Sequence, residues 1–330
     1  RVSSLRGRLL AVPSMNYDGA VEFLGRTSSI MQKPALAIAA LPGRRDRMIE
    51  FAKETEARDF AGVFVTSVSA CLPFCQAILQ ETTRLIVGSS IQPIYFQTAR
   101  QLADNAAFLH EISKGRFRMG LGISHEVSLD RHGVPRTRKP VTDMRAYVAE
   151  MRAAEKEVGE LPPLVLATLR DRMLDLAVEV GNGAVWANGP RDTVAAQLGA
   201  RPASAADDFF TAAMIPTAID DDIDAGRAVH RKTLSRYVQL PNYRKYWSAA
   251  GFEQEMSDIE TAINAGETDR IPSLMSNEWL DSVTMAGPKS RILEGLERWR
   301  DAGVKTPILV PTSTKGSQTT ALAEIFDLFE

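Results

Sequence analysis

The segment RLIVGSSIQPIYFQTARQLADNAAFLHEISKGRFRMGLGIS, residues 84–124, decides the fold. Its two ends are short apolar runs, RLIVGSSI at 84–91 and RFRMGLGIS at 116–124, which predict β-strands. The longer stretch between them has helical spacing and ends at Gly115, a residue suited to the left-handed cap of a helix. A strand, a helix and a strand in succession predict two parallel strands joined by a crossover helix.

The same alternation continues on both sides of this segment. The predicted strands cover 34–41, 61–67, 84–91, 116–124, 162–169, 183–188, 208–216 and 306–311. Eight strands with helical crossovers predict a closed (β/α)8 TIM barrel with its function in the loops after the carboxyl ends of the strands. An N-terminal extension, 1–33, and a helical insertion between strands seven and eight, 237–285, exceed this minimal barrel. We expect residues 1–330 to form a single domain.

Length and charge narrow the class of protein. The chain has 330 residues, within the roughly 200–400 that one α/β barrel occupies. Lys and Arg number 39 against 41 Asp and Glu, and the formal net charge is −2. A chain so nearly neutral has no global field that attracts nucleic acid or anionic lipid, so we expect neither nucleic acid nor a membrane as a partner.

The cysteines, histidines and apolar runs bear on compartment and metal binding. Two cysteines, Cys71 and Cys75, are too few for a disulfide-built secreted scaffold. The apolar run at 9–12 is shorter than the ~7–15 residues of a signal-peptide core, and no apolar run approaches the ~20 residues that cross a bilayer. These features predict a cytoplasmic protein. The four histidines lack zinc-ligand spacing, so no metal site is predicted.

Several ordered stretches resemble the luciferase-like flavin and deazaflavin oxidoreductases, in particular the actinobacterial branch that uses coenzyme F420. The resemblance covers roughly residues 35–312. It is carried by GRFRMGLGISHEV, HGVPRTRKPVTDMRAYVAEMR, PPLVLATLRDRMLDLAVEVGNGAVW, LPNYRKYWSAAGF and SVTMAGPKSRILEGLERWRDAGVKTPILV. It implies a homodimeric, F420-dependent enzyme that transfers hydride to an activated C=C, C=N or C=O bond of a small organic substrate. FMN-dependent monooxygenase chemistry and a catalytically degenerate cofactor-binding barrel are the alternatives.

The third predicted strand ends in small polar residues, Ser89 and Ser90, followed by Ile91. Such a strand end could support a planar ring, or it is an ordinary strand end. The resemblance implies that all three residues contact the cofactor and that a non-proline cis peptide joins Ser90 to Ile91 behind its ring.

The fourth predicted strand ends GLGIS, residues 120–124. Two glycines separated by one residue allow a flat ligand, or another part of the backbone, to approach closely. The resemblance implies that Gly122, Ile123 and Ser124 line the cofactor.

A helix is predicted to begin near Arg170, directly after the fifth strand, so its N-terminus favours an anion at the catalytic edge. The resemblance implies that Thr168, Leu169 and Arg170 hold the cofactor phosphate. Members of the family commonly have glycine where Leu169 or Arg170 stands. Arg170 could contact the phosphate directly, or it could be a solvated residue at the helix start.

His125 and Ser67 are the candidates for catalysis. His125 follows the fourth strand, and its imidazole could donate a proton to the substrate, cap the loop or bind a cofactor oxygen. Relatives have an acidic residue or an Asp-His pair after the second strand, where this chain has Thr66, Ser67 and Val68. The Ser67 hydroxyl could hydrogen-bond a ring or substrate oxygen, but it is a poor proton shuttle at neutral pH. Either His125 or water is therefore expected to supply the proton, or the enzyme turns over slowly.

The insertion is rich in aromatic residues. They are Tyr237, Tyr243, Tyr246, Trp247 and Phe252. Such a cluster could cover a substrate, form a dimer surface or simply pack against the barrel.

Overall fold

A computed structural model describes residues 32–66, 69–131, 133–134 and 139–330. Residues 1–31, nearly all of the predicted N-terminal extension, lie outside the described residues, and so do Ser67 and Val68. Residues 33–330 form one compact unit. The expectation that residues 1–330 form a single domain therefore stays a prediction.

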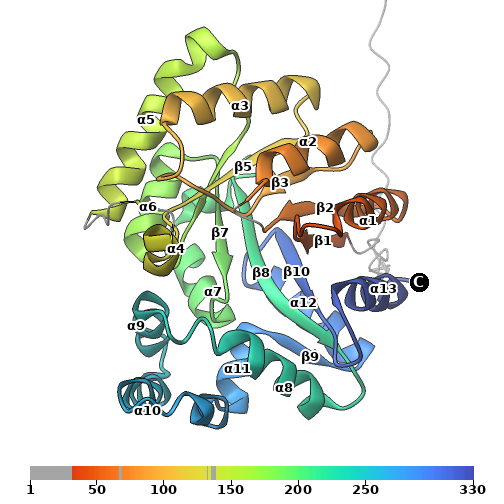
Figure 1. Cartoon of the computed structure of the whole chain (residues 1–330), viewed down its shortest axis with the longest axis vertical. Helices are drawn as coiled ribbons and strands as arrows, with labels where there is room; N and C mark the ends of the chain where they lie inside the picture. The colour runs from red at the N-terminus through yellow and green to blue at the C-terminus, as the bar shows by residue number, and fades with distance from the viewer. Residues whose placement is uncertain (1–31, 67–68, 132, 135–138) are drawn as a thin grey trace, which may run out of the picture. The chain divides into compact units, whose positions relative to one another are not determined.

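Eight parallel strands close into a barrel, which confirms the predicted fold (Figure 1). Their order in the sheet is β10-β1-β2-β3-β5-β6-β7-β8, and pairing between β8 and β10 closes the ring. The strands are β1 (Lys33–Ile38), β2 (Phe60–Val65), β3 (Val87–Ser89), β5 (Phe117–Gly122), β6 (Leu164–Ala167), β7 (Gly183–Ala187), β8 (Phe210–Ile219) and β10 (Thr306–Thr312).

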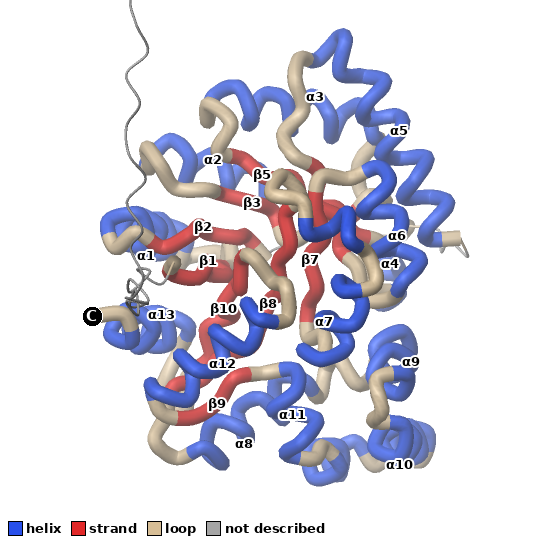
Figure 2. The backbone as a smooth tube through the Cα atoms, turned by 180° about the vertical axis from the view of Figure 1, so that it is seen from behind, coloured by secondary structure: helices blue, strands red, loops and turns tan. Residues whose placement is uncertain are grey.

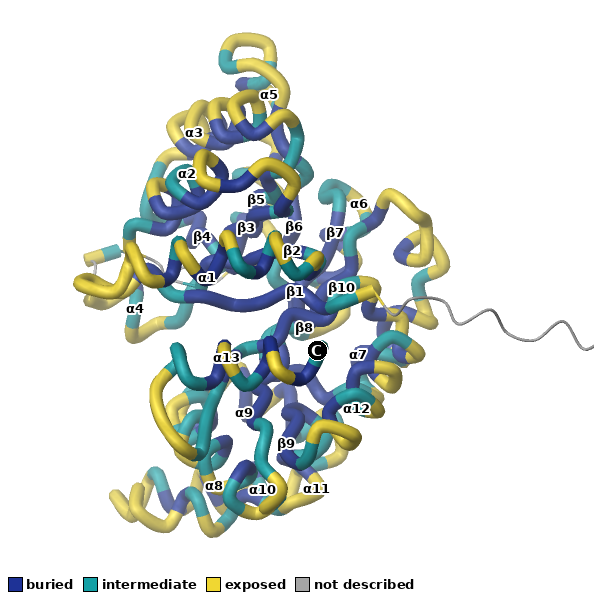
Figure 3. Tube along the Cα trace, turned by 90° about the vertical axis from the view of Figure 1, so that its right-hand side faces the viewer, coloured by how far each residue is buried: buried dark blue, intermediate teal, exposed yellow. Residues whose placement is uncertain are grey.

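Helices surround the strands (Figure 2). They are α1 (Arg45–Ala57), α2 (Cys71–Glu81), α3 (Ala99–Ile112), α4 (Glu126–Arg131), α5 (Pro140–Val158), α6 (Asp171–Val180), α7 (Arg191–Gly199), α8 (Ile223–Leu234), α12 (Lys289–Asp301) and α13 (Gln318–Leu328), with a 3-10 turn η1 (Pro202–Ala205). Their apolar faces are buried against the strands and their outer faces are exposed (Figure 3). The crossover helix α3 ends as its sequence predicts, because Gly115 has a φ of 82° and its N–H donates to the His110 carbonyl.

Most strand ends differ from the sequence prediction by a few residues, and three differences are larger. The third strand is shortened to β3, and before it the Glu56 carboxylate accepts the backbone N–H groups of Thr83, Arg84 and Leu85. A two-residue strand, β4 (Gln92–Pro93), pairs with β5. A further short strand, β9 (Met285–Gly287), pairs with the end of β8 and prolongs it to Ile219. Strands of two or three residues have too little periodicity to be predicted.

The barrel interior is filled by alanines, branched aliphatic residues and two aromatic rings. Phe64 and Phe210 stack with ring centroids 5.7 Å apart. Ala35, Ala37 and Ala212 are buried in the same cluster. The small alanines leave the space that the two rings occupy, so the interior is a packed core.

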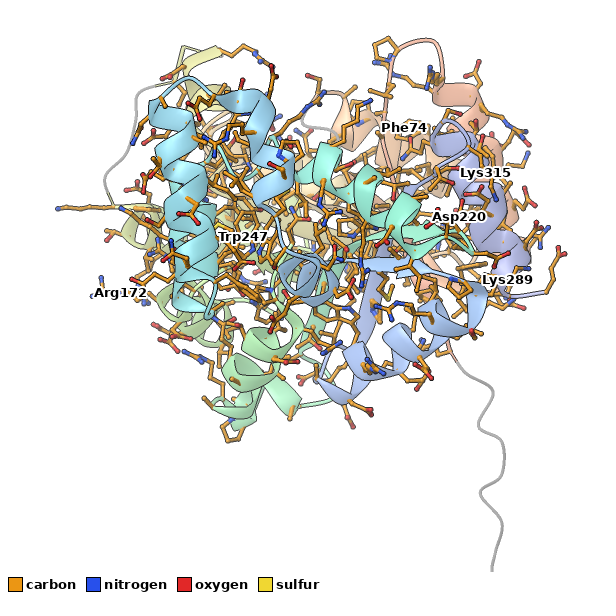
Figure 4. All side chains as sticks on the ribbon, turned by 90° about the horizontal axis from the view of Figure 1, so that it is seen from below. Phe74, Arg172, Asp220, Trp247, Lys289 and Lys315 are labelled. Carbon is orange, nitrogen blue, oxygen red and sulfur yellow. The ribbon has the colours of Figure 1, made fainter. Side chains whose placement is uncertain are left out.

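The insertion between β8 and β10 is helical, as its sequence predicts. It contains α9 (Pro241–Ala249), α10 (Glu253–Asn264), η2 (Thr268–Leu274) and α11 (Asn277–Val283). Its helices share a hydrophobic cluster of their own, in which the Trp247 and Trp279 rings meet edge to face at 4.9 Å. Figure 4 shows Trp247 among these helices. Much of the aromatic content of the insertion therefore serves its own packing.

Candidate functional site

The carboxyl end of β3 is built around two serines with different surroundings. The Ser89 hydroxyl is buried, accepts the Gly120 N–H at 2.9 Å and donates to the Gly120 carbonyl at 3.0 Å. The Ser90 hydroxyl donates to the Met214 sulfur at 2.9 Å. The peptide bond between Ser90 and Ile91 is cis, as the family resemblance implies.

The two glycines of β5 make room for this segment. A Cβ at Gly120 would lie 2.0 Å from the Ser89 carbonyl oxygen, and a Cβ at Gly122 would lie 2.3 Å from Cδ1 of Ile91. No side chain can occupy either place without displacing its neighbour. Of the two explanations that the sequence left open, close approach by another part of the backbone accounts for Gly120, and contact with Ile91 accounts for Gly122.

The residues after β5 turn sharply into the short helix α4. Ile123 is half-buried and packs against the main core, whereas Ser124 takes a left-handed conformation with a φ of 70°. The His125 carbonyl accepts the N–H groups of Ser128 and Leu129, so the backbone of His125 begins α4. This turn brings the His125 side chain to the carboxyl edge of β5.

The His125 imidazole packs against the insertion. Its ring centroid lies 6.5 Å from that of Tyr237 and 5.7 Å from that of Tyr243. Its Nδ1 atom is buried and has no hydrogen-bond partner among the described residues. Burial lowers the pKa of His125 below its ordinary value, and burial also raises the pKa of both tyrosines. At neutral pH the three rings therefore form an uncharged wall. The sequence predicted an aromatic cluster in the insertion, but not its contact with His125.

The turn between β6 and α6 combines a helix start with an unpartnered hydroxyl. The Thr168 N–H donates to the Val185 carbonyl at 2.9 Å, but its buried Oγ1 has no partner among the described residues. Arg170 is exposed and stands at the N-cap position of α6, with no side-chain cap hydrogen bond. The first N–H groups of α6 and the Thr168 hydroxyl are the donors that an anion needs at this edge.

Gln197 of α7 fixes the position of this turn. Its Nε2 atom donates to the Leu169 carbonyl at 3.0 Å and to the Asp171 carboxylate at 3.3 Å. Its Oε1 atom accepts the indole N–H of Trp186 at 3.0 Å. Sequence analysis missed Gln197 because a glutamine in a surface helix carries no signal for a contact with a distant turn.

A second residue that sequence analysis missed, Asn188, joins β7 to the insertion. It follows β7 in a left-handed conformation, with a φ of 54°, and its carbonyl accepts the indole N–H of Trp247 at 2.9 Å. A Cβ at the next residue, Gly189, would lie 3.2 Å from the Tyr246 hydroxyl. That hydroxyl is buried and has no partner among the described residues.

The carboxyl edge of three neighbouring strands thus collects unpartnered polar atoms. His125 follows β5, Thr168 follows β6, and the Tyr246 hydroxyl lies beside Gly189 after β7. Buried polar groups are normally hydrogen-bonded, because an unpaired one costs about 1–3 kcal/mol. Their accumulation at one edge indicates a ligand site. The role predicted for Ser67 remains untested, because Ser67 lies outside the described residues.

Two other kinds of site find no support in the described part of the chain. No group of three or more His, Cys, Asp or Glu side chains among the described residues is arranged to hold a metal ion. None of the helices described is long and apolar enough to cross a membrane.

The closed parallel barrel, with unpartnered groups at its carboxyl edge and a helical insertion before the last strand, has the architecture of an α/β barrel. The sequence profile described as luciferase-like monooxygenase matches residues 30–306. The chain belongs to this family, as the sequence motifs implied.

Individual relatives agree with this assignment. The chain is 24% identical over 257 residues to a 5,10-methylenetetrahydromethanopterin reductase of Archaeoglobus fulgidus, which covers 69% of this chain and 77% of the relative. The coenzyme F420-dependent tetrahydromethanopterin reductase of Methanopyrus kandleri superposes with a TM-score of 0.71 at 18% identity, over 90% of this chain and 100% of its own. An F420-dependent secondary alcohol dehydrogenase superposes with a TM-score of 0.67 at 15% identity, over 91% and 99%. These structures share the fold of this chain.

Proposed function

We propose that this protein is an oxidoreductase that uses reduced coenzyme F420 to reduce a small organic substrate at an activated C=C, C=N or C=O bond. The observation that carries the proposal is the row of unpartnered groups after β5, β6 and β7. The His125 imidazole follows β5, and the N-terminus of α6, a position that suits an anion, follows β6. The F420 dependence named for the two structural relatives supports the choice of cofactor.

The described residues fit such a cofactor. Thr168, Leu169 and Arg170 would hold its phosphate, because the Thr168 hydroxyl and the first N–H groups of α6 are available there. Ser90–Ile91 and Gly122–Ser124 would lie along its ring at the ends of β3 and β5. When bound, reduced F420 supplies the hydride.

His125 would supply the proton. Addition of hydride to a polarised double bond leaves negative charge on the substrate, and a proton that moves from an imidazole nitrogen to that atom neutralises it. Because burial lowers its pKa, the protonated imidazolium that donates would be the minor form at neutral pH, and donation would leave the neutral ring. The imidazole then regains a proton from solvent, to which the half-buried side chain retains access.

The insertion would exclude water from this reaction. Tyr237 and Tyr243 stand against His125, and burial keeps their phenols neutral by raising their pKa. A wall of uncharged rings favours an organic substrate over a hydrated ion.

Titration with F420 and with FMN, followed by cofactor fluorescence, tests the proposal. We expect F420 to bind at micromolar concentration and FMN to bind more weakly. Tighter binding of FMN would replace the proposal with flavin chemistry. Binding of F420 without reduction of any activated C=C, C=N or C=O compound in a substrate panel would replace it with a binding role.

The proposed function includes a quaternary state. We expect a homodimer, from the family resemblance. Sedimentation velocity at micromolar concentration measures this directly, and a monomer would contradict it.

A further inference from the structure

A second pocket lies outside the barrel, between α7, α11, β9 and α12. Its cavity volume is about 40 Å³, it opens to solvent, and it shares no lining residue with the strand-end site. Figures 1 and 2 show α7, α11 and α12 next to one another from opposite sides. Three of its lining side chains are guanidiniums, which come from Arg191, Arg291 and Arg298.

One face of α12 forms a wall of this pocket. Arg291, Gly295, Arg298 and Trp299 have the spacing that places them on one side of a helix. Gly295 allows α12 to approach β9 closely, because a Cβ there would lie 2.8 Å from the Met285 sulfur. Trp299 is only 3% exposed. The arginines of α12 therefore lie on a helix that is packed closely against β9.

The charge of the lining is unbalanced. The carboxylate that lines the pocket belongs to Asp281. It accepts hydrogen bonds from Nη2 of Arg227 at 2.6 Å and from Nη2 of Arg291 at 2.8 Å. Nε of Arg227 also donates to Asp281, at 3.1 Å. Because Arg227 does not itself line the pocket and already neutralises Asp281, the lining keeps an excess of positive charge.

The other two arginines have weak partners. Arg191 pairs with the neighbouring Asp192, whose side chain is 88% exposed. Arg298 pairs at 3.4 Å with Glu294, which is 70% exposed. Exposed pairs of this kind contribute little free energy, so either guanidinium can turn toward a stronger anion at small cost.

We propose that this pocket binds a small ligand through a phosphate group. Guanidiniums match phosphate oxygens with two parallel hydrogen bonds, and several of them suit a group that carries two negative charges. The proposal does not depend on F420, because its residues differ from those of the strand-end site.

Calorimetric titration of the full chain with inorganic pyrophosphate at low ionic strength tests the pocket. The double variant Arg191→Gln with Arg298→Gln should bind pyrophosphate about tenfold more weakly, because it loses charge-assisted hydrogen bonds. The matched control, Arg100→Gln with Arg270→Gln, also removes two guanidiniums from exposed pairs and should stay within about twofold of wild type. Urea unfolding verifies that both variants fold.

Three results would overturn the proposal: no binding by wild type, equal loss in the variant and its control, or competition between pyrophosphate and saturating F420. Competition would place the anion at the Thr168–Arg170 turn instead. Orthophosphate and ribose 5-phosphate, titrated in parallel, distinguish a free ion from a phosphate ester. Binding of either through Arg191 and Arg298 supports the pocket. If the protein binds no F420 at all, the pyrophosphate result still stands and only the proposed function fails.

Discussion

The two ends of the barrel differ in how their polar side chains are hydrogen-bonded. At the amino ends of the strands, Glu56 accepts three backbone N–H groups, and Arg116 donates to the carbonyls of Leu79, Leu85 and Ser113. At the carboxyl ends, His125 and Thr168 keep buried polar atoms without partners. The amino-end contacts stabilise the fold, although Nδ1 of His110, near the end of α3, is also buried without a partner among the described residues. We propose that the unpartnered groups at the carboxyl ends bind a ligand.

The largest expected effect concerns His125 at the carboxyl end. His125→Gln should lower the steady-state rate of substrate reduction about 10²–10⁴-fold, because glutamine keeps the polarity but cannot transfer a proton. The affinity for F420 and the free energy of unfolding should change little. Weaker cofactor binding with an intact rate at saturation would make His125 a cofactor contact, and the proton would then come from water or from the substrate.

The matching substitution at the amino end is Arg116→Met. Four part-buried hydrogen bonds are lost, so the free energy of unfolding should fall by about 2–4 kcal/mol. Urea unfolding measures this loss. The dissociation constant for F420 should stay within about twofold of wild type. A stable variant that binds F420 poorly would break the division between the two ends.

His230 is a second histidine to compare with His125. Its Nδ1 also has no partner among the described residues, but the residue is completely buried and lies away from the strand-end site. Its Nε2 donates to the Met285 carbonyl at 2.9 Å. Burial lowers the pKa of His230 to about 4. At a pH above about 6.5, the ordinary pKa of histidine, the ring is neutral in both the folded and the unfolded chain. In that range the free energy of unfolding does not depend on the titration of His230.

As the pH falls from about 6.5 to about 4, the unfolded chain takes up this proton first, and the free energy of unfolding should drop by about 3 kcal/mol. Below about 4 the loss should level off. His230→Gln keeps a donor for Met285 and should remove this part of the pH dependence, as urea unfolding across that range would show. An unchanged profile would mean that another group causes the acid sensitivity. The F420 affinity at neutral pH should not change.

The smallest expected effect concerns Arg170. Arg170→Glu should weaken F420 binding by about 1–3 kcal/mol if the guanidinium contacts the phosphate. Fluorescence titration measures this, and Arg172→Glu, two residues further along the chain and also exposed, is the charge-matched control. Equal losses in both would indicate a general field effect, and no loss in either would leave the phosphate to the backbone and Thr168.

Local patterns in the sequence predicted most of the fold. The eight barrel strands follow from apolar runs of sufficient length, and the helical insertion follows from its spacing. The short strands β4 and β9 could not be predicted, because their pairing depends on β5 and β8 rather than on their own residues.

The site was predictable only in part. Ser90, Gly122 and Thr168 stand at strand ends, where position along the chain already indicates a role. Gln197 and Asn188 act through contacts with distant segments, and the sequence carries no sign of such contacts. The same holds for the wall that Tyr237 and Tyr243 form beside His125.

The most direct test of the division between the two ends is a crystal structure of this protein with F420 bound. We expect the phosphate within hydrogen-bond distance of the Thr168 hydroxyl and the first N–H groups of α6. The ring should lie against Ser90–Ile91 and Gly122–Ser124, with the substrate side open toward His125. A cofactor bound anywhere else, with the Thr168 hydroxyl still unpartnered, would contradict the account.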